Sequence, residues 1–203
     1  MKKHFDIVSE DLFVNNKVSE LNKLFTELDI NTVFIVRTIK CREDLIKNFN
    51  LPKLKSKVVY KKAYLFKEIS LINNFKENEL VLLEGGDAKR NTEVVNNKKT
   101  RILFNPIYDK LSFDEQNARV SKQNNIKITF NINQFRDRSK LKVIKQTIFI
   151  INILKQHKVD MLFCSMAKEV NQLIDPLVLE SFLLGFDLHD TTIKRFLNKD
   201  ILK

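Results

Sequence analysis

Side chains that could carry chemistry are sparse in this sequence of 203 residues. Its three histidines, His4, His157 and His189, stand apart from one another and from the cysteines and carboxylates that would complete a metal site. A zinc site needs three or four convergent ligands, so we expect none of them to bind a metal. His157 lies at the end of an expected helix, where its positive form would complement the helix dipole.

The two cysteines, Cys41 and Cys164, are far apart in the sequence, and we expect both to be reduced. Cys164 ends an apolar stretch, and nothing in the sequence supplies a base that would activate its thiol as a nucleophile. A buried structural side chain is the better interpretation. Ser165 lacks the flanking glycines of a nucleophile elbow. We therefore predict no catalytic residue, no metal site and no cofactor bound by this chain.

The segment Glu84-Gly85-Gly86-Asp87 follows an expected strand, where barrel enzymes place their sites. Its glycines permit a tight turn, and the next helix offers N–H groups to an anion. The carboxylates of Glu84 and Asp87 would repel a phosphate, so a turn followed by a helix cap is favoured. One enzymatic alternative stays open, a metal-dependent phosphoesterase that uses the strand-end carboxylates Asp6, Glu84 and Asp109.

Basic residues are grouped more clearly than the acidic ones. Between Lys53 and Lys67 six lysines occur with no acidic residue among them. In a helix that begins near Arg138, the side chains of Arg138, Lys142 and Lys145 share one narrow face. Such a face can bind phosphates, although a solvated surface would look the same. The second group consists of Arg136, Arg138, Lys140, Lys142 and Lys145.

Composition limits the class of protein. The chain has 36 Lys and Arg against 25 Asp and Glu, a net charge of +11, and a pI of about 9.6. A basic excess of this size attracts polyanions such as nucleic acids. A hydrophobic fraction of 43% and only three glycines and three prolines exclude a disordered or linker-like chain. No apolar run is long enough for a membrane span, and no secretory signal is recognised, so we expect a cytoplasmic protein.

Short apolar runs alternate with amphipathic stretches along the chain. Asp87 is expected to cap a helix, Ser112 to open a capping box with Glu115, and Gly185 to end a helix as its C′ residue. The segment 139–156 is predicted to be a buried helix, because it is apolar nearly all round at 148–154. Strands are expected at 5–8, 32–37, 58–66, 80–83, 101–104, 126–130 and 159–164. Helices are expected at 17–28, 41–49, 67–76, 88–97, 112–124, 139–156, from 175 to about 184, and at 190–197.

Strict alternation of strand and helix predicts a parallel sheet with crossover helices. No glycine-rich dinucleotide fingerprint follows the first strand, which favours a closed barrel over an open doubly wound sheet. The predicted fold class is therefore α/β, a TIM-barrel-like (β/α) barrel with about seven parallel strands, helices outside and a helical C-terminal tail. We predict a single domain over residues 1–203.

From Leu80 onward the sequence resembles RNase P protein component 3, the archaeal relative of the eukaryotic thirty-kilodalton subunit. The resemblance runs through LVLLEGGDAKRN, TRILFNPI and SFDEQNARVSKQNNIKITFNINQF, and then through LKVIKQTIFIINILKQHKVDMLFCSMA and LIDPLVLESFLLGFD. These pieces cover about the last 120 residues in order.

This resemblance implies a PHP-like barrel without the metal centre of the PHP phosphoesterases, in keeping with the absence of a His-x-His pair in the first strand. It also implies that an RNA subunit, using Mg²⁺, cuts the 5′ leader from precursor tRNA. The chain would be a non-catalytic subunit that pairs with RNase P protein component 2 in a two-plus-two assembly, beside other protein subunits. Its expected RNA contacts are Arg138, Lys142 and Lys145, followed by Arg90, Arg101 and Arg136.

Two positions depart from the family pattern. Many members have a histidine before the proline of Asn105-Pro106, and many have an arginine where this chain has Ile174 in Leu173-Ile174-Asp175-Pro176. The second change puts one RNA or partner contact in doubt, but the Asp175-Pro176 helix start is expected to survive. A third hypothesis, a basic barrel that acts only as a protein scaffold, differs in predicting no salt-dependent RNA binding.

Overall fold

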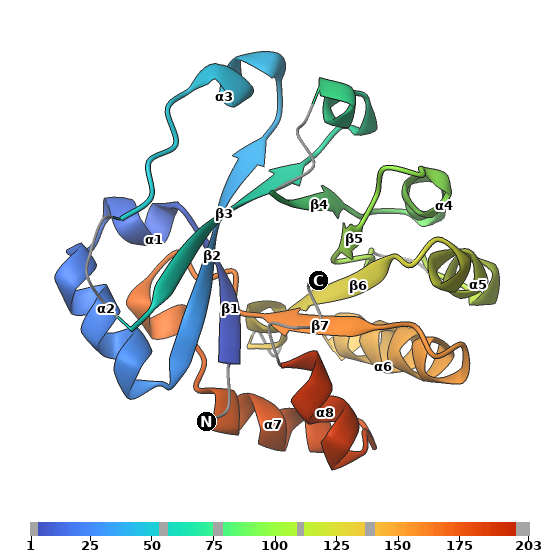
Figure 1. Ribbon diagram of the computed structural model, residues 1–203. Coiled ribbons are helices and arrows are strands. Elements are labelled where there is room, and N and C mark those ends of the chain that lie inside the picture. Colours follow the sequence, from blue (N-terminus) through green and yellow to red (C-terminus); the bar gives the residue numbers. More distant parts are fainter. Residues whose placement is uncertain (1–3, 53–56, 75–78, 109–111, 137–140, 198–203) are drawn as a thin grey trace. The chain divides into compact units, whose positions relative to one another are not determined.

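The structure is a computed structural model that describes residues 4–52, 57–74, 79–108, 112–136 and 141–197 (Figure 1). Each strand is followed by a helix or a 3₁₀ turn. The strands are β1 His4–Ser9, β2 Ile30–Ile39, β3 Val59–Phe66, β4 Leu80–Glu84, β5 Ile102–Phe104, β6 Lys127–Asn131 and β7 Met161–Cys164. The helices are α1 Asp11–Val14, α2 Val18–Glu27, α3 Arg42–Ile46, α4 Ala88–Asn96, α5 Glu115–Gln123, α6 Leu141–Gln156, α7 Pro176–Leu184 and α8 Asp190–Phe196, with 3₁₀ turns η1 Ile69–Asn74, η2 Ile132–Phe135 and η4 Val170–Gln172.

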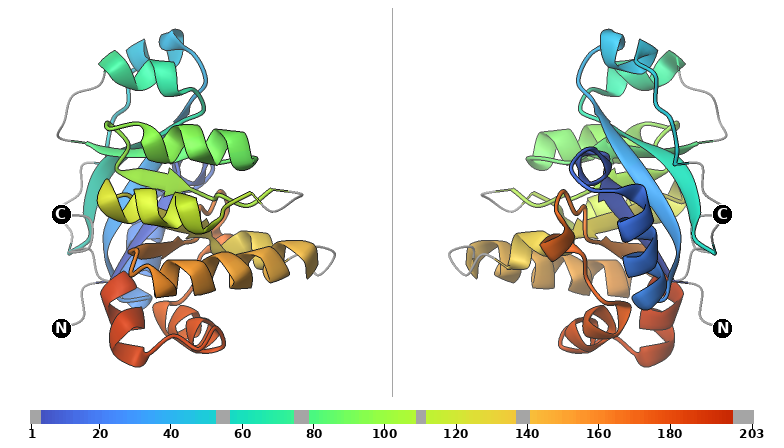
Figure 2. Two further views of the ribbon diagram at one scale, coloured as in Figure 1. Left: turned by 90° about the vertical axis from the view of Figure 1, so that its right-hand side faces the viewer. Right: turned by 90° about the vertical axis from the view of Figure 1, so that its left-hand side faces the viewer.

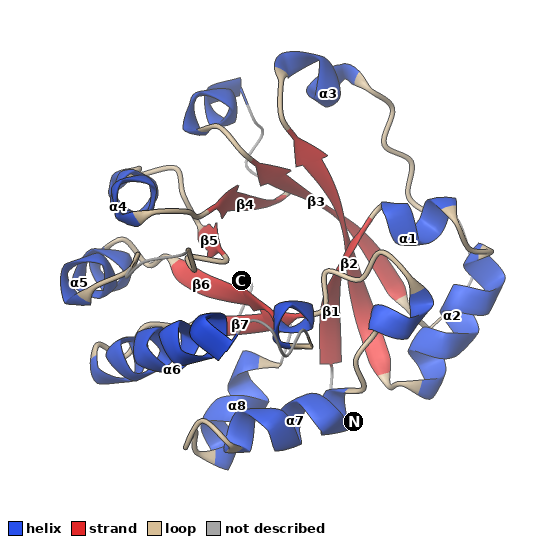
Figure 3. Cartoon of the chain, turned by 180° about the vertical axis from the view of Figure 1, so that it is seen from behind, coloured by secondary structure: helices blue, strands red, loops and turns tan. Residues whose placement is uncertain are grey.

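Seven strands form one sheet in the sequential order β1-β2-β3-β4-β5-β6-β7. The pairing is parallel between β1 and β2, between β4 and β5 and between β5 and β6. Parallel neighbours need a crossover, and the α-helices and 3₁₀ turns between the strands supply it (Figure 3). Sequential parallel order with such crossovers is the topology of a (β/α) barrel. The predicted TIM-barrel-like α/β fold class is therefore confirmed.

The chain divides into two compact units. Unit 1 comprises residues 1–37, 48–63 and 164–203, and unit 2 comprises residues 38–47 and 64–163. Unit 1 thus contains β1, α1, α2, α7 and α8, and unit 2 contains β4 to β6 and α4 to α6.

In unit 1, β1 is buried along its whole length. Beyond β7 the backbone continues beside β1, where Met166 N donates to Ile7 O at 2.8 Å and Ser9 N donates to Ala167 O at 3.0 Å. The Asp6 carboxylate accepts from Ser165 N at 2.8 Å and from Ser165 Oγ at 2.6 Å, as well as from Ile7 N at 2.8 Å. One buried acidic side chain therefore ties the first strand to the chain that leaves the last strand.

In unit 2, helices α4, α5 and α6 lie side by side (Figure 2). The buried Asn91 side chain connects the start of α4 to two loops. Its Nδ2 donates to Gly86 O at 3.0 Å, Pro106 O at 3.0 Å and Ser112 O at 2.7 Å, and its Oδ1 accepts from Gly86 N at 3.0 Å. A methyl group at Gly85 would lie 2.7 Å from Asn91 Oδ1, which explains a glycine there.

The predicted capping box at Ser112 is wrong. Helix α5 begins at Glu115, and its cap is Asp114, whose carboxylate accepts from Asn117 N at 2.8 Å. Ser112 is buried, and its Oγ donates to Pro106 O at 2.5 Å. The Ser112 hydroxyl therefore bonds to a loop carbonyl and does not cap the helix, although the local sequence pattern predicted that it would.

Three further predictions about helices need correction. Gly185 caps α7 with φ −62°, in the right-handed region, and the left-handed residue after α7 is Asp187 with φ 55°. In α6, Ile148 and Phe149 are 41% and 45% exposed, so this helix is not buried all round. Within 41–49 and the described part of 67–76, which ends at residue 74, helical structure is limited to the short α3 and the 3₁₀ turn η1.

Replacing Asn91 by alanine should destabilise the protein by about 3 kcal/mol, because it leaves several buried backbone groups without partners. Urea denaturation measures this change. Asn96→Ala is the matched control in the same helix, since its side chain is exposed and makes one bond, to Thr92 O. We expect the control to cost less than about 1 kcal/mol. Equal losses in the two variants would contradict the role given to Asn91.

Burial raises the pKa of Asp6 from 3.8 to about 6, although the hydrogen bonds from Ser165 and Ile7 act in the opposite direction. The folded protein therefore holds this proton more tightly than the unfolded chain does. The resulting stabilisation is fully present below pH 3.8 and is lost as the pH rises through about 6.

Asp6→Asn removes this titration while keeping an amide oxygen that accepts from the same backbone N–H groups. Between pH 4 and 7, the free energy of unfolding of the unaltered protein should fall by about 2.4 kcal/mol relative to that of the variant. Urea titrations at several pH values measure this difference. The exposed Asp29→Asn should track the unaltered protein. A pH-independent difference between Asp6→Asn and the unaltered protein would refute the assignment.

Candidate nucleic-acid interface

The Glu84–Asp87 turn uses its anion-binding groups internally. The Asp87 carboxylate accepts from Arg90 N at 2.8 Å and so caps α4, as predicted. Gly86 N donates to Asn91 Oδ1. The Glu84 carboxylate pairs with Lys67 Nζ at 3.2 Å. The interpretation of this segment as a turn followed by a helix cap is confirmed.

Arg90, one of the expected RNA contacts, is half-buried and bonded within unit 2. Its Nε donates to Glu84 O at 3.2 Å, and its Nη2 donates to Lys67 O at 2.5 Å. The guanidinium thus joins the ends of β3 and β4 to the first turn of α4. Two of its five N–H donors serve the fold, and the others remain for a ligand.

Several cations of the 53–67 group are also engaged. Lys53 and Lys55 lie outside the described residues, and Lys57 is exposed. Lys61 Nζ lies 5.7 Å from the centre of the Phe34 ring, and Lys62 Nζ lies 5.6 Å from that of Phe49. These cation–π contacts and the Lys67–Glu84 pair account for much of the charge in this group within the protein itself.

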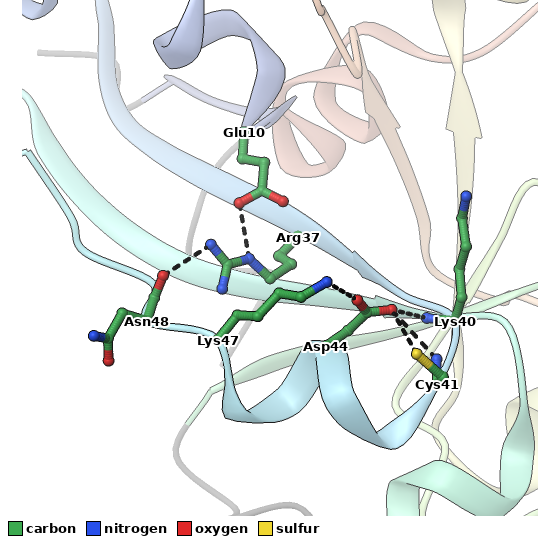
Figure 4. Close-up of polar contacts among 7 residues, drawn as sticks. All are labelled: Glu10, Arg37, Lys40, Cys41, Asp44, Lys47 and Asn48. Atoms are coloured by element: carbon green, nitrogen blue, oxygen red, sulfur yellow. Dashed lines mark hydrogen bonds and ion pairs between the residues drawn. The ribbon is translucent and has the colours of Figure 1, made fainter.

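Arg37 shows the same use of charge (Figure 4). Its Nε donates to Glu10 Oε2 at 2.8 Å, its Nη2 donates to Asn48 O at 3.1 Å, and its guanidinium lies 4.5 Å from the centre of the Phe49 ring. Because this side chain is only slightly exposed and has three kinds of partner, it stabilises unit 1.

Both cysteines are free, as predicted. Cys164 is buried, and burial raises the pKa of its thiol. Cys41 is exposed, but a hydrogen bond with the Glu43 carboxylate is the largest of the influences that raise its thiol pKa. The Asp44 carboxylate also accepts from Cys41 Sγ at 3.4 Å and from Lys47 Nζ at 2.7 Å (Figure 4). A raised pKa disfavours the reactive thiolate in both side chains.

The first turns of α6 present cations to solvent. Lys142 and Lys145 are exposed on one side of the helix, beside the exposed Leu141. Arg136 is exposed at the end of η2, and Arg138 lies outside the described residues. The predicted helical face is therefore observed for its last two members.

A second group of cations gathers where β5, β6 and β7 begin, all within unit 2. The preceding connections, residues 97–101, 122–127 and 155–160, lie side by side, because Lys127 N donates to Arg101 O and Ile128 N donates to Asp160 O, each at 3.0 Å. They contain one carboxylate, that of Asp160. We call this group the basic cluster; it consists of Lys98, Lys99, Arg101, Lys122, Lys127, Lys155 and Lys158.

Electrostatics within the basic cluster favours an anion. Burial lowers the pKa of the half-buried Lys127; the nearby Asp160 raises it, and Arg101 lowers it further. Lys122 and Lys155 lie in the last turns of α5 and α6, where they also complement the helix dipoles. Phosphate groups bound here would reduce the repulsion among the cations of the basic cluster.

The sequence analysis identified only Arg101 as a candidate contact in this cluster. Its other members are dispersed along about 60 residues, and they come together because parallel order places all connections from helix to strand at one edge of the sheet. A signal was present in the sequence, since each of the three connections before β5, β6 and β7 carries at least two cations.

Two of the three carboxylates of the enzymatic alternative are described, and both are engaged in other contacts. Asp6 is buried against Ser165, Glu84 pairs with Lys67, and Asp109 lies outside the described residues. Among the described residues, no group of three or more His, Cys, Asp or Glu side chains could hold a metal ion. His4 is buried in β1, and His189 Nδ1 lies 3.0 Å from Thr191 Oγ1.

The two departures from the family pattern have different local effects. Asn105 adopts φ 52° and its N donates to Thr129 O at 2.7 Å, while its Oδ1 is buried and has no hydrogen-bond partner among the described residues. Beside Ile174, the Asp175 carboxylate accepts from Leu177 N at 2.7 Å. The expected survival of the α7 start is therefore confirmed.

Searches with the sequence find no matching protein family and no matching curated protein. No helix in the described ranges is long and apolar enough to cross a membrane.

Solved structures share the fold. One chain of archaeal ribonuclease P, determined by cryo-electron microscopy with mature tRNA, aligns with a TM-score of 0.75 at 18% identity, over 95% of this chain and 87% of that chain. An uncharacterized protein aligns with a TM-score of 0.63 at 8% identity, over 99% and 73% of the two chains. An amidohydrolase aligns with a TM-score of 0.57 at 9% identity, over 100% and 73%. At these identities the likeness is one of fold.

Proposed function

We propose that this chain is a protein subunit of ribonuclease P, the ribonucleoprotein that removes the 5′ leader of precursor tRNA. The carrying observation is the fold alignment with a chain of archaeal ribonuclease P, which covers 95% of this chain. The resemblance of the sequence from Leu80 onward to RNase P protein component 3 points to the same particle. The net charge of +11 suits a subunit of an RNA-containing particle.

In this proposal the chain works by electrostatics and by docking. Catalysis belongs to the RNA subunit with its Mg²⁺, and the chain itself binds no metal and supplies no catalytic group. Its exposed cations screen RNA phosphates that would otherwise repel one another, so the folded RNA needs less Mg²⁺. Aromatic side chains are scarce in the basic cluster, which suits contact with phosphates better than stacking on bases.

We rank the expected RNA contacts by the exposure and internal bonding of their side chains. Lys142, Lys145 and Arg101 are exposed and stand first. Arg136 and Arg138 remain expected contacts beside the start of α6. Arg90 comes last, because two of its donors serve the fold.

The remaining parts of the proposal concern assembly. The chain would act as one domain over residues 1–203 in the cytoplasm and would pair with RNase P protein component 2 in a two-plus-two complex. Precursor tRNA and further protein subunits would complete the particle. The fold alignment supports this setting through a chain whose own structure was determined within ribonuclease P.

Reconstitution tests the function directly. The purified chain, together with component 2 from the same source, should allow the cognate RNase P RNA to cleave precursor tRNA at a Mg²⁺ concentration where the RNA alone is inactive. Asp6→Asn should leave this activation intact, because the amide oxygen of asparagine still accepts from Ile7 N and Ser165 N, and Asp6 supplies no catalytic group in this proposal. No activation at any Mg²⁺ concentration would refute the proposal, and metal-dependent phosphoester hydrolysis by the chain alone, abolished in Asp6→Asn, would favour the phosphoesterase.

Salt dependence tests the basic cluster. Each lost phosphate contact lowers the slope of log K against log salt by about 0.7 to 0.9, so Arg101→Ala combined with Lys158→Ala should lower it by about 1.5. The matched control replaces Lys17 and Lys23 of α2, which are equally basic and exposed but pair with Glu20 and Glu27. Fluorescence anisotropy with labelled RNase P RNA provides the slopes. Equal slopes for both variants would exclude the basic cluster, and no salt dependence at all would favour the pure scaffold.

A further inference from the structure

The outer face of α7 is apolar, in a part of the chain that is otherwise acidic. Leu177, Val178, Phe182 and Leu184 are 62%, 63%, 37% and 53% exposed. They account for four of the twelve large apolar side chains that lie exposed in the described residues. We call these four side chains the α7 face (α7 is labelled in Figure 1).

The α7 face is one continuous surface. Leu177 and Leu184 are separated by two helical turns and point the same way, and Val178 and Phe182 form a parallel row beside them. Pro176, Leu179 and Leu183 on the opposite side are buried in unit 1. Seven of the nine residues of α7 are apolar, and the exposed Ser181 is the one polar residue between the two exposed rows. A helix of this composition normally has both sides covered.

Charge distinguishes this region from the rest of the chain. Residues 169–193 contain five carboxylates and neither lysine nor arginine, in a chain whose net charge is +11. The Asp175 carboxylate caps α7, and Asp190 pairs with Lys194 in α8. Acidic surroundings repel RNA phosphates, so the α7 face is unsuited to RNA.

A second copy of the chain is also a poor occupant. A symmetric dimer places the same patch of both copies in contact. The two copies of the acidic range 169–193 would then approach each other and repel. Charge complementarity instead requires basic side chains around the apolar residues of the partner.

We propose that the α7 face docks a protein partner that presents apolar side chains flanked by lysine or arginine. This inference rests on the proposed function, in which component 2 is the protein partner. It divides the chain's surface by charge: the basic cluster and the start of α6 face RNA, and the acidic region around α7 faces protein.

The test uses the full chain with Leu177→Ser and Val178→Ser. The matched control replaces Val14 and Ile46, which are also exposed and apolar but lie on α1 and α3. Isothermal titration with purified component 2 should show at least about a tenfold weaker affinity for the α7 variant and an unchanged affinity for the control. Anisotropy with RNase P RNA should give the same affinity for both. Glu180→Gln combined with Asp187→Asn should weaken component 2 binding and reduce its salt dependence.

Each other outcome overturns the inference. If the α7 variant binds component 2 with unchanged affinity, the α7 face is not the docking surface. If the α7 variant binds RNA more weakly, the α7 face is an RNA contact. If sedimentation shows that the unaltered chain self-associates and that the α7 variant does not, the α7 face contacts a second copy of the chain. A melting temperature lowered in the α7 variant but not in the control shows that a segment of the chain itself covers it. An unaltered chain that binds RNA but not component 2 refutes the docking alone, whereas one that binds neither refutes the proposed function as well.

Discussion

The buried carboxylate of Asp6 is the contact on which unit 1 depends. A strand that is buried along its whole length needs hydrogen-bonding neighbours at both edges, and β1 has β2 on one side and residues 165–167 on the other. Asp6 secures the second edge with both the backbone and the hydroxyl of Ser165. Its partners must stay in place, because a buried acidic group that loses its donors costs several kcal/mol.

Charge in this chain divides into two kinds. Arg37 and Arg90 bind carbonyls and a carboxylate inside the fold, and Lys67 pairs with Glu84, so these cations stabilise the ends of strands and helices. The basic cluster differs from these cations, because its seven cations come from three connections that contain only one carboxylate. Net charge alone does not separate the two kinds. Their separation needs the partner of each side chain, and this is why a functional surface emerges only after the internal contacts have been assigned.

Periodicity in the sequence was sufficient for the fold class. Alternation of short β-branched runs with amphipathic stretches predicts seven strands, the Asp87 cap and the Asp175-Pro176 helix start, and all of these are observed. Predictions failed where tertiary contacts outweigh local preference, as at Ser112, whose hydroxyl bonds to Pro106. The basic cluster was only partly predictable, because its residues are neighbours across strands and not along the chain. Arg90 was predicted as an RNA contact, but its internal hydrogen bonds are to the carbonyls of Glu84 and Lys67, which no local pattern reveals.

The distance in sequence between Asp6 and Ser165 affects how the protein folds during its synthesis. These residues are 159 positions apart, so on the ribosome β1 leaves the exit tunnel long before its second neighbour exists. Domains whose contacts span such distances fold slowly, and an apolar strand with one open edge is prone to aggregate while it waits. The nascent chain therefore has a long interval in which chaperones can bind the unprotected β1, and this interval ends only after residues 165–167 have been synthesised.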